Sequence, residues 1–575
     1  MKRRAASLGL FGCSLTNGYS EGEERLSNLL NTVVISSLSK VFADEEAIDP
    51  LLKKASAFSN ETYAYQIAYR SPSLMKAVRV SVRSELADAI SVRTVGLAPS
   101  ELPWMHDADR HVLRTTPGLY PDPLYPIDEQ EGLTLFPGQW RALWVTVSLD
   151  GSQAAGQYEI EVRFDNEQGE CLASEKMVLE IIGAMLPEQK LIHTEWFHTD
   201  CLAVQYGVEV FSERHWELID RYVDTAVRHG VNMILTPVFT PPLDTAVGGE
   251  RPTVQLVDVE QTGSSYRFGF DKLRRWVELC DKRGIRYFEF SHLFTQWGAK
   301  HAPKIMADVD GEYKRIFGWD TDANGEAYRG FLEQFLRELV AFIRENGLEQ
   351  RSFFHNSDEP RMADMEQYQK ISEFTRKHLQ GFPIIDALSD YAFYEKGLVE
   401  RPIPASNHIE PFIENGVKPL WTYYCVSQRN LVSNRFFNMP SARNRIIGMQ
   451  LYKFGAEGFL HWGYNFWFSQ YSRKPINPFV NTDANHSFPS GDAFLVYPGE
   501  EGPIESIRME VFYEALQDLR ALQLLESYIG KERVVALLEE DLEQPITFSE
   551  YPRSAEWLLA KREQLNRLIA QHAQS

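Results

Sequence analysis

The 575-residue sequence has few cysteines and no long apolar run. Its cysteines are odd in number and none forms a CxxC pair, which excludes a disulfide framework and a zinc ribbon. No segment approaches the ~18 consecutive apolar residues of a membrane helix. The HExxH, GxxxxGK[ST] and GxGxxG patterns are also absent, so neither a catalytic metal nor a phosphate cradle is indicated. We therefore predict no cofactor and no metal. The five cysteines are Cys13, Cys171, Cys201, Cys280 and Cys425.

The charge balance is acidic, with 59 Lys+Arg against 80 Asp+Glu and a net charge of −21. Such a chain repels a phosphate backbone, which argues against a nucleic-acid partner. Lys2 to Arg4 precede a short, interrupted apolar stretch and Cys13, a weak likeness to a signal or lipoprotein leader. We predict a cytoplasmic protein without membrane association, with secretion or lipid anchoring as the less favoured alternative. The sequence indicates no oligomeric state.

Residues 1–188 carry the pattern of short β-strands. Apolar and polar residues alternate over 76–82 and 158–164, and 140–147 is rich in aromatic and β-branched residues. Asp150-Gly151 supplies a turn after the 140–147 segment. This predicts an N-terminal antiparallel β-sandwich.

Residues 191–505 alternate between helical stripes and short apolar runs. The unit recurs eight times, which predicts a central (β/α)8 barrel whose long loops, notably after Leu235 and Phe290, build the site. Residues 506–575 predict a C-terminal helical region packed on the barrel. The fold class expected is therefore a multidomain α/β protein. The eight barrel strands expected are 193–197, 231–235, 285–290, 352–355, 382–388, 403–408, 419–424 and 458–462.

Two adjacent acids follow the fourth of these strands, in Asp358-Glu359-Pro360. That position is the carboxyl-terminal mouth of the barrel, where barrel enzymes hold their chemistry. Cleavage of a glycosidic bond needs one acid to protonate the leaving oxygen and a second group to act at the anomeric carbon. Neighbouring carboxyl groups raise each other's pKa, so one can stay protonated near neutral pH. We predict that Asp358 and Glu359 are catalytic.

Aromatic and polar residues gather at the other predicted strand ends. Flat sugar faces pack on aromatic rings, while His, Asn and Asp bind hydroxyl groups. Barrel interiors prefer branched aliphatic side chains, so this many aromatic residues at one mouth indicates a binding site. The candidate substrate-binding residues are Trp196, His198, Asp200, His292, Trp297, His355, Asn356, Trp421, Tyr423, Tyr424, Trp462, Tyr464 and Asn465.

Four segments in this order resemble glycoside hydrolase family 123 and the wider DUF4091 family, over roughly residues 20–525. They are Tyr120-Pro-Asp-Pro-Leu124, Asp358-Glu359-Pro360, His461-Trp-Gly-Tyr-Asn465 and Gly491-Asp492 followed by Tyr497-Pro-Gly499. The resemblance implies a retaining β-N-acetylgalactosaminidase whose substrate provides its own nucleophile, the 2-acetamido oxygen. In that reaction Asp358 would orient the acetamido N–H and Glu359 would act as general acid and then base. Tyr424 or Tyr464 would bond the acetamido group.

Two alternatives stay open. The first is a conventional glycosidase that pairs Glu359 with a distant carboxylate such as Asp200, Glu289 or Asp386. The second is a carbohydrate-binding barrel without catalysis. The pattern does not distinguish GalNAc from GlcNAc, and it fixes neither the linkage nor the aglycone; the expected partner is a carbohydrate that carries an N-acetylhexosamine.

Overall fold

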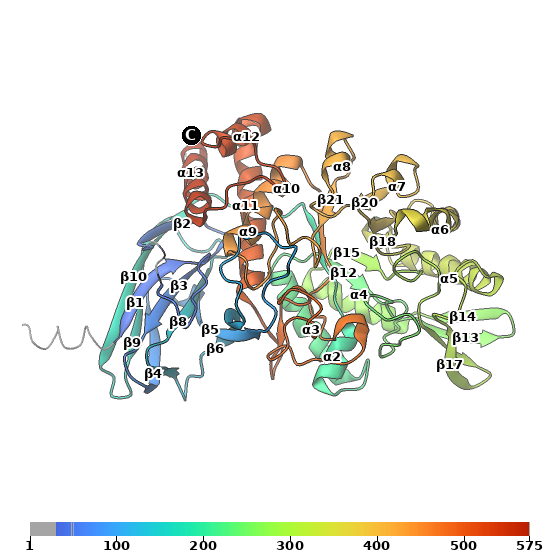
Figure 1. Ribbon diagram of the computed structural model, residues 1–575, viewed down its shortest axis with the longest axis horizontal. Coiled ribbons are helices and arrows are strands. Elements are labelled where there is room, and N and C mark those ends of the chain that lie inside the picture. Colours follow the sequence, from blue (N-terminus) through green and yellow to red (C-terminus); the bar gives the residue numbers. More distant parts are fainter. Residues whose placement is uncertain (1–29, 48, 50, 574–575) are drawn as a thin grey trace, which may run out of the picture.

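The computed structural model describes residues 30–47, 49 and 51–573. In Figure 1 the N-terminal strands lie at the left, the parallel strands lie to the right of centre, and the C-terminal helices stand above and between them. The predicted leader-like segment, Lys2 to Cys13, lies outside the described residues. None of the helices in the described part of the chain is long and apolar enough to cross a membrane.

The first ten strands form two five-stranded sheets. Neighbouring strands are antiparallel except for β2 and β10, which pair in parallel. Buried residues from both sheets, among them Tyr65, Val145, Ile160 and Leu179, form one apolar core between them, as the alternating patterns predicted. One sheet runs β1 (Asn31–Ser36), β3 (Thr62–Arg70), β8 (Trp140–Ser148), β5 (Ile90–Ser100), β6 (Gly118–Pro126); the other runs β2 (Lys54–Phe58), β10 (Cys171–Ile182), β9 (Gly156–Asp165), β4 (Met75–Arg83), β7 (Leu133–Leu135).

Six parallel strands form the central sheet, and the two remaining predicted strands pair with each other. Isolated bridges between Phe354 and Ile384, and between Ala405 and Tyr423, connect the two sheets. The (β/α)8 expectation is thus confirmed in part, as curled parallel sheets in an α/β fold. The central sheet runs β18 (Ser352–Phe354), β15 (Tyr287–Phe290), β12 (Met233–Thr236), β11 (Ile192–Glu195), β22 (Gly458–His461), β21 (Trp421–Tyr423); the pair is β19 (Ile385–Ala387) and β20 (Arg401–Ile403).

Helices separate these strands along the chain. The helix α3 begins at the cap that the sequence indicates, because the Ser212 side chain accepts a hydrogen bond from the His215 N–H. The sixth strand differs from its expected position, since 401–403 form it and Ala405 makes a single bridge. The helices are α2 (Thr199–Tyr206), α3 (Glu213–Arg228), α4 (Asp271–Arg283), α5 (Glu326–Glu345), α6 (Met365–His378), α7 (Ala392–Glu395), α8 (Glu410–Glu414), α9 (Ser441–Arg445) and α10 (Ile447–Phe454).

Two smaller sheets decorate the parallel region. One has four strands in the order β14 (Ser265–Gly269), β13 (Asp258–Thr262), β16 (Ile305–Val309) and β17 (Glu312–Phe317). Its strands belong to the long connections after β12 and β15, so these connections have structure of their own beside the strand ends. The other sheet is the pair β23 (Tyr497–Pro498) and β24 (Pro503–Ile504).

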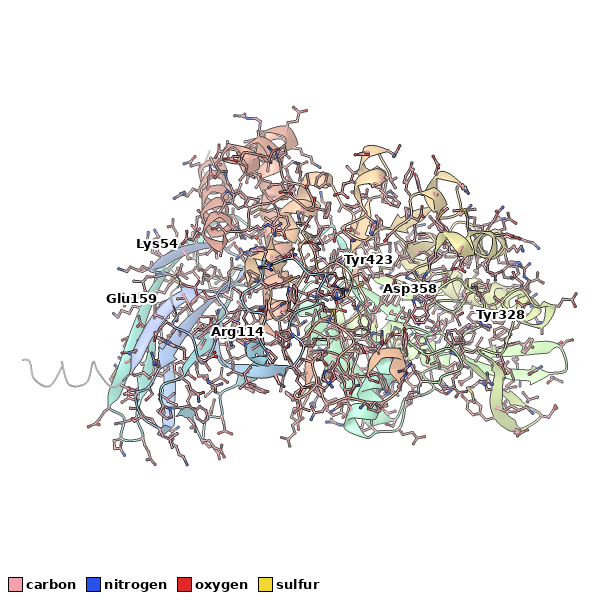
Figure 2. All side chains as sticks on the ribbon, in the orientation of Figure 1. Lys54, Arg114, Glu159, Tyr328, Asp358 and Tyr423 are labelled. Atoms are coloured by element: carbon pink, nitrogen blue, oxygen red, sulfur yellow. The ribbon has the colours of Figure 1, made fainter. Side chains whose placement is uncertain are left out.

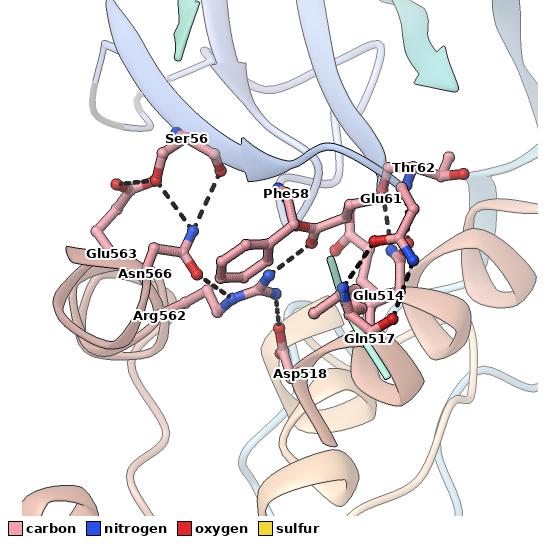
Figure 3. Close-up of polar contacts among 12 residues, drawn as sticks. Ser56, Phe58, Glu61, Thr62, Glu514, Gln517, Asp518, Arg562, Glu563 and Asn566 are labelled. Atoms are coloured by element: carbon pink, nitrogen blue, oxygen red, sulfur yellow. Dashed lines mark hydrogen bonds and ion pairs between the residues drawn. The ribbon is translucent and has the colours of Figure 1, made fainter. Parts of the chain in front are cut away.

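The C-terminal helices α11 (Ile507–Ile529), α12 (Lys531–Glu539) and α13 (Ala555–Ala573) join the sandwich to the parallel sheet. Apolar residues of α11 share one core with Phe58 of the sandwich and Phe459 of β22. Figure 3 shows the polar part of this junction. Arg562 bonds Glu61 at 2.7 Å and also contacts Asp518. The Ser56 N–H and hydroxyl donate to Glu563 at 2.9 and 2.7 Å.

Candidate active site

A cavity of about 810 Å³, open to solvent, lies at the carboxyl ends of the parallel strands. Side chains from β19, β21 and β22 reach it together with loops that follow β11, β12, β15, β18, β21 and β22. Both predicted catalytic acids are in its wall. The lining residues are Trp196, Leu243, Asp244, Gln296, Trp297, Asp358, Glu359, Ala387, Tyr423, Cys425, Val426, Ser427, Leu460, Trp462, Gln470, Tyr471 and Phe488.

Backbone hydrogen bonds hold the acidic pair at the end of β18. The Trp297 N–H donates to the Asp358 carbonyl at 2.9 Å, and the Glu359 N–H donates to the Ala387 carbonyl at 3.0 Å. Glu359 has a φ of 45°, in the left-handed region that costs a non-glycine residue roughly 1–3 kcal/mol. Asp358 is half-buried and Glu359 is exposed, so Asp358 is the inner member of the pair. Neighbouring loops therefore fix two consecutive carboxyl groups at the cavity.

The surroundings of the pair favour a neutral carboxyl at Asp358. Burial raises the pKa of Asp358 well above its ordinary value, and the charge of Glu359 adds to this effect. The Tyr423 hydroxyl donates a 2.7 Å hydrogen bond to Glu359 Oε1. Asp358 and Tyr423 are labelled in Figure 2 and lie in the same part of the molecule. The two acids thus have different environments, the condition under which one carboxyl holds a proton while its neighbour is charged.

A buried ionic cluster lies beneath the pair. His355 bonds Glu289 through Nε2, and its Nδ1 lies 3.3 Å from Asp386 Oδ1. Burial disfavours the imidazolium of His355, but the two carboxylates outweigh it and raise the pKa of His355 to about 9. Asp386 also accepts the N–H groups of Asn356 and Ser357, at 2.9 and 3.2 Å. This cluster holds the backbone just before Asp358 in place.

A third carboxyl group, Asp244, enters the cavity from the loop after β12. Burial raises the pKa of Asp244 to about 6. The Gln296 side-chain oxygen accepts the Asp244 N–H at 2.7 Å, and the Tyr471 N–H donates to Asp244 Oδ2 at 2.9 Å. Asp244, Trp297 and Tyr471 have φ values of 37°, 56° and 61°. With Glu359, four of the lining residues hold a backbone conformation that side-chain-bearing residues seldom adopt, a feature that clusters at functional sites.

Two indole rings in the wall are held by buried carboxylates. Trp196 Nε1 donates to Glu289 at 2.8 Å, and Trp462 Nε1 donates to Asp492 at 2.8 Å. Half-buried Trp297 contacts Tyr471 edge to face, with ring centroids 5.7 Å apart. The cavity therefore combines three carboxyl groups with fixed aromatic walls, the composition that suits a sugar ring.

The structure brings together part of the set of predicted site residues. Trp196, Trp297, Tyr423 and Trp462 line the cavity with Asp358 and Glu359. His292, His355 and Asn356 are buried and are not among the residues that line it. The remaining predicted residues lie away from the cavity; these are His198, Asp200, Trp421, Tyr424, Tyr464 and Asn465.

Those six residues have structural partners elsewhere. Arg251 binds Asp200 with two hydrogen bonds, of 2.8 and 2.7 Å, and lies 3.2 Å from His198 Nδ1. Asn465 exchanges hydrogen bonds with the backbone of His198, and Trp421 is buried against Gly458.

The two tyrosines expected at the acetamido group point elsewhere. The Tyr424 hydroxyl donates to Asn444 at 3.3 Å, and the Tyr464 hydroxyl donates to the Tyr222 carbonyl at 2.9 Å. Because successive side chains of a strand point to opposite faces, Tyr423 of β21 enters the cavity while Tyr424 packs outside.

Sequence patterns missed Asp244, Gln296, Tyr471 and Phe488 in the wall. The first two belong to the long loops after β12 and β15, which the sequence does mark as builders of the site. Tyr471 and Phe488 come from the irregular chain after β22, which has no periodicity. Among the described residues, no group of three His, Cys, Asp or Glu side chains is arranged to hold a metal ion.

Comparison with known proteins assigns the family. Residues 196–525, more than half of the chain, match the family model for the glycoside hydrolase 123 catalytic domain. The protein is therefore a glycoside hydrolase. It belongs to glycoside hydrolase family 123, as its motifs indicated. No curated protein matches the sequence.

A solved structure supports the same fold. A family 123 glycoside hydrolase from Clostridium perfringens, described in terms of glycolipid glycan hydrolysis, superposes with a TM-score of 0.73 at 15% identity, over 95% of this chain and 99% of that one. A putative beta-galactosidase from Bacteroides fragilis (TM-score 0.30, 9% identity, 80% and 58% coverage) is far more distant. So is an endo-beta-1,4-mannanase from Thermotoga petrophila (TM-score 0.33, 12% identity, 59% and 78% coverage).

Proposed function

We propose that this glycoside hydrolase removes a terminal β-linked N-acetylhexosamine by substrate-assisted catalysis with retention of configuration. The observation that carries the proposal is the pair of consecutive carboxyl groups, Asp358 and Glu359, in one aromatic-walled cavity. In a conventional retaining reaction the acid and the nucleophile act from different sides of the scissile bond, whereas these two consecutive residues come from one loop in one part of the cavity wall. They suit a division in which one serves the 2-substituent and the other serves the glycosidic oxygen.

The first step uses both acids. The acetamido oxygen attacks C1 while Glu359 gives its proton to the glycosidic oxygen, which leaves with the bonding electrons. The ring that forms is an oxazolinium ion, and Asp358 accepts the acetamido N–H and stabilises the positive charge that develops there. In the second step Glu359, now a carboxylate, takes a proton from water. That water attacks C1 and reopens the ring, so the product keeps the original configuration.

The electrostatics support this order of events. Burial and the charge of Glu359 favour a proton on Asp358 in the empty cavity. An acetamido N–H can only donate a hydrogen bond, so a bound substrate favours the ionised form of Asp358. In the proposed reaction Glu359 then provides the proton that the leaving oxygen accepts. Binding of an N-acetylated sugar thus prepares Glu359 to act as the general acid, whereas a plain hexose has no acetamido N–H to donate to Asp358.

Two further expectations accompany the function. We propose that the eight parallel strands act as one closed (β/α)8 barrel, which supports the acids on rigid elements. The regions 1–188, 191–505 and 506–575 remain our proposed domains, and cytoplasmic location remains a prediction.

A conventional two-carboxylate reaction is the second candidate, and Asp244 favours it. Among the distant acids suggested by the sequence, Glu289 and Asp386 bond His355, and Asp200 bonds Arg251. Asp244 instead lines the cavity with Glu359. In this scheme Asp244 would be the nucleophile and the acetamido group would be dispensable.

One screen tests both candidates. Aryl β-N-acetylhexosaminides and the matching plain hexosides are offered to the full chain, and the anomer of the first product is recorded. Substrate assistance predicts a β-anomer from the N-acetylated substrates alone, with tight binding of a GalNAc-derived thiazoline. Equal turnover of plain hexosides, or weak thiazoline binding, would favour the conventional reaction. Sugar binding with no turnover would favour the non-catalytic alternative.

A further inference from the structure

A second hollow adjoins the catalytic cavity. Its space of about 960 Å³ is open to solvent, and Trp297 and Tyr471 line both this hollow and that cavity, so the two spaces meet at these residues. We call it the basic hollow. Its lining residues are Trp297, Lys300, Arg361, Ala363, Asp364 and Tyr471.

The two spaces differ in charge. The catalytic cavity is lined by Asp244, Asp358 and Glu359, and none of the described residues in its wall is Lys or Arg. The basic hollow contains Lys300 and Arg361 against a single carboxylate. In a chain of net charge −21, this local excess of cations requires a reason.

The cations of the basic hollow are available to a ligand. Lys300 is 60% exposed and pairs with Asp364 at 3.0 Å, which neutralises that carboxylate. Arg361 is exposed and has no hydrogen-bond or ion-pair partner for its guanidinium in the described part of the chain. A third cation stands close by, because the Arg473 guanidinium carbon lies 5.2 Å from the centroid of the Tyr471 ring. Buried or paired arginines elsewhere hold the fold together; Arg361 does not.

The basic hollow lies on the side of the general acid. Arg361 follows Glu359 by two residues, which limits the distance between their Cα atoms to about 7 Å. Glu359 is the exposed member of the acidic pair, whereas Asp358 is the inner one. A leaving group that extends from Glu359 toward solvent would therefore pass close to Arg361.

We propose that the basic hollow is a leaving-group subsite that binds an acidic sugar, one that carries a carboxylate or a sulfate ester. The inference rests on the proposed function, because it assigns the leaving group by the position of the general acid. A guanidinium presents two parallel N–H donors to either anion, and the Lys300 ammonium adds a point charge. The Trp297 and Tyr471 rings provide the surface on which the sugar ring packs.

The expected selectivity follows from the exposure of these cations. An exposed ion pair contributes up to about fivefold in affinity, so two cations together predict a preference of roughly tenfold for an acidic over a neutral leaving group. Because exposed charges are screened by salt, the preference should shrink toward unity at about 1 M salt.

Binding is measured with the full-length Glu359→Gln chain, so that no ligand is cleaved. The ligands are disaccharides of N-acetylgalactosamine β-linked to glucuronic acid or to glucose, and to galactose 6-sulfate or to galactose. The two pairs distinguish a carboxylate from a sulfate, with a neutral partner for each. Each affinity is measured by calorimetry at low and high salt, and the wild-type chain is assayed for turnover of the same four compounds.

Two arginine variants decide whether the basic hollow causes the preference for acidic ligands. Arg361→Gln should lower the ratio of acidic to neutral affinity severalfold. Arg344→Gln removes an exposed arginine from the last turn of α5 and changes the net charge equally, and it should keep the wild-type ratio. The subsite would be overturned if the ratio of acidic to neutral affinity is near unity in the Glu359→Gln chain that carries no further substitution. It would also be overturned if the preference survives when Lys300→Gln is added to Arg361→Gln.

The outcomes separate the subsite from the hydrolase. Turnover of neutral and acidic disaccharides at equal kcat/KM overturns the subsite and leaves the hydrolase in place. An acid preference in binding that disappears in Arg361→Gln, without turnover of any N-acetylhexosaminide, would show that the basic hollow binds acidic sugars, but it would overturn the proposed hexosaminidase activity and with it the leaving-group role of the hollow. If none of the disaccharides binds, the subsite is overturned; if the wild-type chain also hydrolyses no aryl N-acetylhexosaminide, the proposed function is overturned with it.

Discussion

Removal of the Tyr423 hydroxyl is the sharpest test of the catalytic geometry. Its 2.7 Å hydrogen bond to Glu359 Oε1 is the side-chain contact that orients the proposed general acid. Hydrogen bonds to a carboxyl group that is charged during the reaction contribute about 1.5–3 kcal/mol. If the whole of this energy is lost in the transition state, Tyr423→Phe lowers kcat/KM by about 30-fold, the factor that corresponds to ~2 kcal/mol.

The assay compares Tyr423→Phe with Tyr424→Phe on an aryl β-N-acetylgalactosaminide. The second variant removes the neighbouring hydroxyl, which bonds Asn444 on the other face of the strand. It should cost stability of about 1 kcal/mol while kcat/KM stays within about twofold of wild type. If Tyr424→Phe lost activity and Tyr423→Phe did not, the orientation of β21 assigned to this site would be wrong. Equal losses of kcat/KM in both variants would show that activity depends on packing around β21 and not on the Tyr423–Glu359 hydrogen bond.

Three further perturbations test the site. Glu359→Gln should lower kcat by about 10²- to 10⁴-fold with little change in KM, because general acid–base catalysis typically contributes that much; steady-state kinetics that match wild type would contradict the assignment. Folding raises the pKa of His355 from 6.5 to about 9, so the folded protein binds more protons than the unfolded one, and stability falls as pH rises between these values. In urea unfolding, the free energy of unfolding of wild type should fall by about 3 kcal/mol between pH 6 and pH 9.5, whereas that of His355→Gln should not. If the two proteins show the same dependence on pH, this prediction is wrong. Burial likewise raises the pKa of Asp244 from 3.8 to about 6, which costs stability as pH rises through that range. Between pH 4 and pH 7 the free energy of unfolding of Asp244→Asn should therefore rise by about 2 kcal/mol relative to wild type, a value that allows for the partial exposure of Asp244. If the difference between the two proteins is the same at both pH values, this prediction is wrong.

The sequence was most informative where the chain is periodic. Strand 352–354 is apolar and short, so the acids that follow it had to emerge at the edge where parallel strands end. The alternating runs at 76–82 and 158–164 likewise predicted strands of the N-terminal sheets, because in each of them every second side chain is buried or half-buried. The motifs of the family then added what periodicity lacks, namely the chemistry of the pair.

The sequence was least informative where long-range contacts decide the orientation of a side chain. Asp200 and His198 follow a strand just as the catalytic acids do, but Arg251, some fifty residues later, binds both and holds them away from the cavity. Asp244 and Tyr471 are far apart in the chain and meet through a backbone N–H and a carboxylate, each in a left-handed conformation. No local propensity encodes such a meeting, because tertiary contacts hold these residues in conformations that their own propensities disfavour.

The Arg562 guanidinium on the last helix has a consequence for how the protein can be dissected. It joins Glu61 of the sandwich to Asp518 of α11, and Arg445 holds the other oxygen of Asp518 at 2.7 Å. A fragment confined to residues 196–525 would lose both Glu61 and Arg562, so that Arg445 alone would face the two buried carboxylates Glu514 and Asp518. Uncompensated interior charge of that kind costs several kcal/mol, comparable with the whole stability of many domains. We therefore expect a core excised from its flanking regions to be much less stable than the full chain and to be recovered as aggregates rather than as active enzyme.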